Sequence, residues 1–236
     1  MNAKNYHFIA LLTLAIVSLY SCEKADVVVS KSQLALSVNS DSTTFNVKNS
    51  TGKSTATPPM VTFINGVMNI STFKFDGILN KKPTEFTTDN ANNIDIFSTS
   101  PVATITTLDN GTYSSVVLTV KLSKSATIIP LIIKGTYSSP TGVMTTLEVD
   151  YNDDTEIKTK IKDQLIVDGL KDFSSNVKVH LDKLFAGIAS ADLDKATQVN
   201  GAIVISSIYN KTLYAKIKAN IVNSGGTDGV EIFLED

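Results

Sequence analysis

The residues best suited to chemistry are the acidic side chains of the segment "DYNDDTE". It supplies the four carboxylates of Asp150, Asp153, Asp154 and Glu156. Carboxylate oxygens are the hard ligands that Ca²⁺ prefers, so these residues are candidates for a calcium site. Asn and Asp also favour tight turns, and a solvated hairpin turn explains the same segment. We expect the turn, with no resident metal ion or other cofactor.

A second acidic segment, "DNANNID" (Asp89–Asp95), superficially resembles a calcium-binding loop. Its third position is Ala91, and its sixth is Ile94, where such a loop needs Gly for a sharp turn. Two carboxylates for glycoside hydrolysis could be drawn from these loops, but no sequence spacing predicts their separation in space. Neither segment therefore predicts a catalytic site.

Histidine chemistry is nearly absent from the chain. His7 lies in an N-terminal segment that we expect to be removed, which leaves His180 as the one imidazole. No GxSxG motif supplies a nucleophile for a triad, and no second His or Cys accompanies His180 in a zinc site. Between Val179 and Leu181, His180 is expected on the polar face of a strand. We expect a protein without catalytic activity.

Tyrosines could bind sugars by stacking, but the chain has no Trp, the commonest stacking residue. We expect most of the tyrosines to be half-buried structural residues. The residues considered are Tyr113, Tyr137, Tyr151, Tyr209 and Tyr214.

The pentapeptide GTYSS occurs twice, around Tyr113 and Tyr137. The midpoint of the two copies is Ser125, in the polar segment "SKSAT". A hairpin symmetric about Ser125 would place the two tyrosines opposite each other as a cross-strand pair. The repeat thus predicts a structural pair of tyrosines that stabilises a hairpin, rather than a binding motif.

Short β-rich segments recur through the chain with turn residues between them. In "YSSVVLTVKL" apolar residues alternate with polar ones, which is typical of a half-buried strand. Helical segments are expected near 182–222, at about 181–188, 190–198 and 207–222, with Ser190 as an N-cap. The pattern predicts a mainly β fold over 34–236: one antiparallel β-sandwich domain, immunoglobulin-like or transthyretin-like, with short C-terminal helices.

The N-terminus has the layout of a secretory signal peptide over residues 1–21. Lys4 and His7 precede the apolar stretch "FIALLTLAIVSL", which is short for a membrane-spanning helix. The following "LYSC" resembles the lipobox of bacterial lipoproteins, although Tyr20 departs from the usual small residue. The resemblance implies that Cys22, the only cysteine, is lipidated and becomes the first mature residue. Residues 22–33 then form a tether.

The lipobox, the absence of Arg and Trp, and the richness in Lys, Asn, Ile, Thr and Ser resemble uncharacterised lipoproteins of Bacteroidota. That resemblance implies an outer-membrane lipoprotein, at the cell surface or on the periplasmic face. The charged residues Glu23, Lys24 and Asp26 partly match the surface-export signal of the group, and a solvated tether explains them equally well. Asp41–Ser42–Thr43 resembles its O-glycosylation acceptor.

The net charge of −2 and the lack of Arg argue against a nucleic-acid partner. Two functions remain for an anchored, non-catalytic β protein. The first is a binding or structural module for a glycan or a protein partner. The second is a periplasmic carrier or chaperone for a hydrophobic ligand, which predicts an apolar pocket of several hundred Å³ beneath the C-terminal helices.

Overall fold

Alternating apolar side chains build a mainly β structure, which confirms the predicted class. The computed structural model describes residues 30–40, 42–50, 57–99, 102–224 and 232–235. In β8 (Gly111–Leu122) the predicted inward residues are buried and Lys121 is exposed on the other face. The buried residues are Val116, Leu118, Val120 and Leu122. Burial of one face of each strand gives the chain its core.

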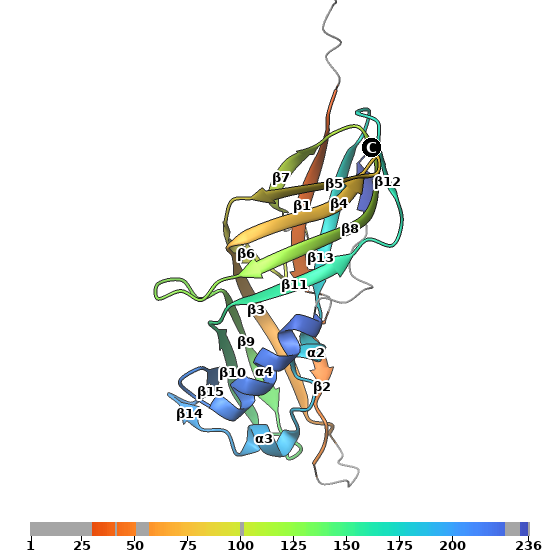
Figure 1. The fold of residues 1–236 in the computed structure, drawn as a ribbon. Coiled ribbons are helices and arrows are strands. Elements are labelled where there is room, and N and C mark those ends of the chain that lie inside the picture. The colour runs from red at the N-terminus through yellow and green to blue at the C-terminus, as the bar shows by residue number, and fades with distance from the viewer. Residues whose placement is uncertain (1–29, 41, 51–56, 100–101, 225–231, 236) are drawn as a thin grey trace, which may run out of the picture. The chain divides into compact units, whose positions relative to one another are not determined.

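A four-stranded sheet has the order β16-β13-β1-β7 (Figure 1). Its strands are β16 (Ile232–Glu235), β13 (Asp172–Val179), β1 (Ser32–Ser40) and β7 (Val102–Leu108). β1 and β13 run parallel, whereas the other two pairs are antiparallel. The sheet therefore joins segments from both ends of the described chain.

A five-stranded sheet is antiparallel throughout and has the order β11-β8-β4-β5, with β12 also paired to β8. Its other strands are β11 (Thr155–Lys160), β4 (Thr72–Leu79), β5 (Lys82–Thr88) and β12 (Leu165–Val167). On its buried face Phe75 stacks on Phe86, with ring centroids 4.5 Å apart, and meets the edge of Tyr113 at 5.6 Å. These aromatic contacts hold the β4–β5 hairpin on β8.

A seven-stranded sheet carries the helices on one face. Its order is β14-β15-β10-β9-β3-β2, and β6 also pairs with β3. Its strands are β14 (Gln198–Val199), β15 (Ala202–Ser206), β10 (Met144–Tyr151), β9 (Leu131–Ser138), β3 (Met60–Ile70), β2 (Thr44–Asn46) and β6 (Ala91–Asp95). β10 and β15 are parallel, and the other pairs are antiparallel.

Aromatic side chains fill the space between this sheet and the helices. The helices are α2 (Leu181–Leu184), α3 (Ser190–Asp194) and α4 (Lys211–Ser224). Phe185, just after α2, lies with its ring centroid 5.6 Å from that of Phe63 on β3. Tyr214 on α4 lies 5.9 Å from Tyr151 at the end of β10. No helix in the described residues has the length and apolar character needed to cross a membrane.

The helices confirm the predicted region: α2 and α3 begin at the predicted residues 181 and 190 but are shorter, and α4 begins at Lys211 rather than near 207. Ser190 is the first residue of α3 rather than its N-cap, because the N-cap position is taken by Ala189. The Ala189 N–H donates to the Asp192 carboxylate at 3.0 Å, so the side chain three residues later satisfies the helix start. Near its C-terminus the long helix runs to Ser224, two residues beyond the predicted end at 222.

The predicted pairing of the two GTYSS copies is wrong. Tyr113 lies on β8 in the five-stranded sheet, and Tyr137 lies on β9 in the seven-stranded sheet. Each strand already has neighbours on both sides, β4 and β11 for β8 and β3 and β10 for β9. The connection 123–130 is long enough to leave one sheet and enter the other, with Pro130 just before the start of β9.

The sandwich prediction is confirmed only in its mainly β character. The strands form three sheets, and two of these contain a parallel pair. The buried residues of all three sheets belong to one hydrophobic cluster. An immunoglobulin-like or transthyretin-like arrangement is not confirmed by this topology.

Candidate binding site

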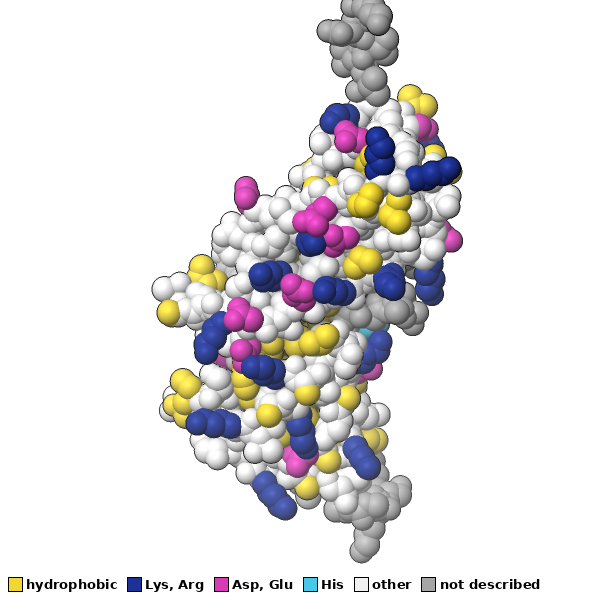
Figure 2. Space-filling view, in the orientation of Figure 1, with side chains coloured by type: hydrophobic (Ala, Val, Ile, Leu, Met, Phe, Trp, Pro, Cys, Tyr) yellow, Lys and Arg dark blue, Asp and Glu magenta, His cyan; other side chains and the backbone are white. Residues whose placement is uncertain are grey.

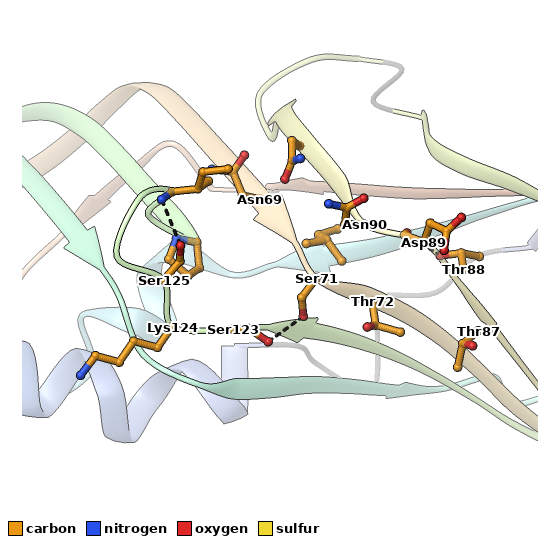
Figure 3. Close-up of a pocket in the computed structure, with 14 residues that line it drawn as sticks. Asn69, Ser71, Thr72, Thr87, Thr88, Asp89, Asn90, Ser123, Lys124 and Ser125 are labelled. Atoms are coloured by element: carbon orange, nitrogen blue, oxygen red, sulfur yellow. Dashed lines mark hydrogen bonds between the residues drawn. The ribbon is translucent and has the colours of Figure 1, made fainter.

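A surface pocket of about 620 Å³ lies where the chain passes between the five-stranded and seven-stranded sheets (Figure 3). β3 passes into β4, β5 into β6, and β8 into β9, and each of these crossings contributes to the lining. The lining residues are Asn69, Ile70, Ser71, Thr72, Thr87, Thr88, Asp89, Asn90, Asn92, Ser123, Lys124, Ser125, Ile128 and Pro130. The lining is thus built from sheet-to-sheet crossings rather than from one sheet face.

Ser71 is the corner at which β3 of one sheet becomes β4 of the other. Its backbone N–H and its hydroxyl both donate to the Lys121 carbonyl, each at 2.9 Å. The Ser123 hydroxyl donates to the Ser71 hydroxyl at 2.9 Å. The corner is therefore fixed to the end of β8 by three hydrogen bonds, and one wall of the pocket is rigid.

Asn69 joins two of the crossings across the pocket. Its side-chain amide donates to the Ile129 carbonyl at 2.7 Å, and its side-chain carbonyl accepts the Asn93 N–H at 2.8 Å. Its backbone N–H donates to the Pro130 carbonyl at 2.7 Å. Asn93 has a φ of 58°, the left-handed region that Asn tolerates better than most residues. Asn69 thereby holds β6 and the 123–130 crossing against β3.

A fourth crossing, from β10 to β11, supports the 123–130 segment from outside the pocket. Asn152 and Ser125 exchange two hydrogen bonds, from the Ser125 N–H at 3.0 Å and from the Asn152 amide to the Ser125 carbonyl at 2.8 Å. The Lys124 N–H donates to the Asp154 carboxylate at 3.0 Å. The Asn152 N–H in turn donates to the Tyr214 hydroxyl at 3.1 Å, so α4 positions this support.

Several polar side chains of the pocket remain available to a ligand. Within the described residues, no hydrogen bond or ion pair engages the side chains of Thr72, Thr87, Asp89, Asn90 and Asn92. Figure 3 shows Thr87 and Asn90 on the side formed by the end of β5, opposite Ser125. It also shows the Lys124 ammonium directed away from the other lining residues. The available groups are amides, hydroxyls and one carboxylate.

The lining side chains offer both donors and acceptors of hydrogen bonds. Amides both donate and accept, hydroxyls do the same, and a carboxylate accepts from hydroxyl groups. Ile128, which is 46% exposed, gives the pocket apolar surface beside these groups. Asp89 and Lys124 are the charged residues of the lining.

Three of the four carboxylates predicted as calcium candidates have other partners in the structure. Asp153 forms an ion pair with Lys218 of α4, and Glu156 pairs with Lys158 at 2.8 Å. Asp154 accepts the Lys124 N–H described above. Nowhere in the described ranges do three acidic, His or Cys side chains gather closely enough to hold a metal ion. The segment is a crossing between two sheets rather than the expected hairpin turn.

Asp150, the fourth calcium candidate, lies on the uncovered face of β10. Burial, and after it the neighbouring Glu148 carboxylate, raise the pKa of Asp150 to about 6, with Lys134 acting in the opposite direction. Glu148 itself pairs with Lys134 of β9 at 3.0 Å. Asp150 therefore has Glu148 and Lys134 as its charged neighbours, whereas the other three candidates contact different residues.

The tyrosines are more deeply buried than the sequence predicts, apart from Tyr209, which is 43% exposed. The Tyr137 hydroxyl donates to the Asp194 carboxylate at 2.9 Å and fixes β9 to α3. Burial raises the pKa of Tyr151 to about 12. None of the five tyrosines lines the pocket, so they offer it no stacking surface.

The other residues singled out from the sequence lie away from the pocket. His180 is half-buried at the start of α2. Ser42 and Thr43 are described, and the Thr43 carbonyl accepts the Phe63 N–H at 2.7 Å. Cys22, Asp41 and the charged residues Glu23, Lys24 and Asp26 lie outside the described residues.

Sequence reasoning missed the pocket because its walls come from three separate connections. The available signal was the polar character of those connections, "NIST", "TTDNANN" and "SKSAT", each placed between apolar strands.

No family model, curated protein or solved structure matches this chain.

Proposed function

We propose that this protein is a non-catalytic binding module, anchored to the outer membrane through Cys22, whose polar pocket binds a neutral, hydroxyl-rich ligand of the glycan class. The observation that carries the proposal is the set of available amide and hydroxyl groups on a rigid corner between two sheets. Sugars present alternating donors and acceptors, and amide and carboxylate groups bind adjacent hydroxyls in pairs. The exposed apolar surface of Ile128 suits the C–H face of a sugar ring.

The size and charge of the site support the same ligand class. A pocket of about 620 Å³ lies within the range of roughly 300–1,000 Å³ that small-molecule sites occupy. Asp89 is the one acidic residue in the lining, which disfavours a strongly anionic ligand. Figure 2 shows basic and acidic side chains interspersed over the visible face, without a large patch of one sign.

The alternative function, a carrier for a hydrophobic ligand, has less support. It requires an apolar space between the helices and the seven-stranded sheet. In the described residues that space contains the ring contacts of Phe185 with Phe63 and of Tyr214 with Tyr151. The pocket described above is polar and lies at the sheet crossings.

The proposed architecture keeps the finer part of the fold prediction. We take the four-stranded and five-stranded sheets as the two layers of a sandwich of the immunoglobulin-like or transthyretin-like kind. The seven-stranded sheet and its helices would then extend this sandwich through β3, β9 and β10. The glycan pocket would lie at the junction.

A glycan array probed with the purified full chain tests the ligand class. We expect binding to neutral oligosaccharides and none to a parallel array of fatty acids and lipids. Binding to lipids alone would instead support the carrier. Protease treatment of intact cells, with mass spectrometry of the N-terminus, tests the anchor: a diacylglyceryl-modified Cys22 is expected, and a chain that begins elsewhere would exclude the lipid.

A further inference from the structure

One edge strand of the protein is unprotected. β7 pairs with β1 along one side, and no described strand pairs with its other side. Figure 1 shows β7 at the margin of its sheet. The N–H and C=O groups along such an edge are a template for another strand, and proteins usually protect their edges with charges, prolines or short strands.

The other edges in the described part of the chain have such protection. β5 contains Lys82, Pro83 and Glu85, and β11 contains Glu156, Lys158 and Lys160. The edge strands β14, β2 and β16 have only two, three and four residues. β7 has seven residues, with neither a charged side chain nor a proline. The exposed edge of β7 is therefore an exception within this molecule.

The side chains of β7 add apolar surface to this edge. Val102 and Ile105 are 54% and 59% exposed. Ile105 lies opposite Ala35 of β1, on the outer face of the sheet, whereas Thr104 and Thr106 lie opposite the buried Leu36 and Leu34. A register shift between β1 and β7 at the Val102 end leaves regular pairing with β1 from Thr104 to Leu108.

We propose that β7 pairs antiparallel with β7 of a second copy, about a twofold axis at Ile105. The sequence around Ile105 is Thr-Ile-Thr, which reads the same in both directions, so Thr104 would lie opposite Thr106 of the second copy. Thr–Thr and β-branched pairs favour such a contact. A charged partner would find no complementary charge on this strand, whereas a second copy meets no repulsion. The contact is isologous and closes as a dimer.

Sedimentation velocity of the full chain in mild detergent, over a range of concentrations, tests the proposal. We expect a monomer–dimer equilibrium. Ile105→Lys and Ile105→Glu each place like charges opposite one another, so each variant alone is expected to be a monomer. An equimolar mixture of the two is expected to restore the dimer, because opposite charges then meet at the axis. Ile166→Lys is the control, since Ile166 is exposed on β12, away from this edge.

A covalent test guards against variants that fail to fold. In a Cys22→Ser background, Ile105→Cys is expected to form a disulfide-linked dimer on oxidation, because Cα atoms of a directly opposed pair lie about 4.5–5.5 Å apart. Ile166→Cys should stay monomeric under the same conditions. A wild-type chain that is monomeric at every concentration, or a dimer that survives Ile105→Lys, would overturn the proposal.

Discussion

Single residues at the sheet crossings make contacts that a sequence pattern does not reveal. Asn69 illustrates this, because its three hydrogen bonds reach Ile129, Pro130 and Asn93 in two separate connections. Asp150 shows the converse, since its carboxylate is half-buried beside that of Glu148 and has a raised pKa. The first residue contributes to the stability of the pocket, and the second reduces the stability of the sheet at neutral pH.

Asp150→Asn is expected to stabilise the protein above pH 6. The pKa of Asp150 is about 6 in the folded state and near 3.8 when unperturbed, so the folded state holds a proton that the unfolded state has lost between these values. Stability therefore falls as pH rises from about 4 to about 6, by about 1 kcal/mol once solvent screening of this half-exposed group is included.

Urea unfolding at a series of pH values measures this effect. The free energy of unfolding of Asp150→Asn should not fall between pH 4 and 6 as that of the wild type does. At pH 7 it should be larger than that of the wild type. Asp163→Asn is the matched control, because Asp163 is exposed in a connection outside the strands. Parallel pH profiles for wild type and Asp150→Asn would contradict the assignment.

At the scale of elements, the strands form from their own alternation, but their crossings depend on contacts between distant segments. α4 is an example, because Tyr214 accepts the Asn152 N–H, and Asn152 holds Ser125 at the pocket. The helix thus positions a pocket that it does not line. Gly135 is a second example, at the contact between β9 and β3.

Tyr214→Phe is expected to weaken the support of the pocket. It leaves the partly buried Asn152 N–H without its acceptor, which costs about 1–3 kcal/mol of unfolding free energy. Ligand affinity should fall with it, because the Ser125 segment loses its support. Tyr209→Phe removes an exposed hydroxyl and should change neither quantity. Thermal unfolding and titration calorimetry compare the two variants; equal effects would argue against the connection through Asn152.

Gly135→Ala is expected to disrupt the seven-stranded sheet. An added Cβ would overlap the Thr62 carbonyl oxygen and lie 2.6 Å from the Phe63 Cα, both of them backbone atoms that cannot rotate away. We expect a loss of about 3 kcal/mol or more of unfolding free energy. Thr136→Ala, at the next position of β9 on the uncovered face, should cost under about 1 kcal/mol. Urea unfolding measures the free energy of unfolding of both variants. A similarly small loss in both would mean that β3 shifts to make room for the added Cβ.

At the scale of the whole molecule, sequence patterns predicted the strands, the helical region and the mainly β class. The alternation in β8 and β10 was sufficient because burial of one face depends on residues close in sequence. The sheet to which each strand belongs was not predictable in the same way. The error over Tyr113 and Tyr137 arose because a hairpin and a crossing between sheets use the same polar connection.

The pocket was beyond prediction for the same physical reason. Asn69, Asp89 and Ser125 are far apart in sequence and meet only because four connections cross between the same two sheets. The N-terminal features concern residues outside the described part of the chain, and the lipid on Cys22 remains a prediction. In the function proposed above, the lipid on Cys22 would hold the protein at the outer membrane and the pocket would bind the ligand.

Titration calorimetry with the best neutral oligosaccharide from the array tests the pocket most directly. The double variant Asn90→Ala/Asn92→Ala removes two available amides, and at about 0.5–1.5 kcal/mol for each hydrogen bond its affinity should fall about fivefold or more. Asn223→Ala, an exposed position near the end of α4, is the control and should bind like the wild type. Unchanged affinity of the double variant for that oligosaccharide would place the binding site elsewhere on the protein.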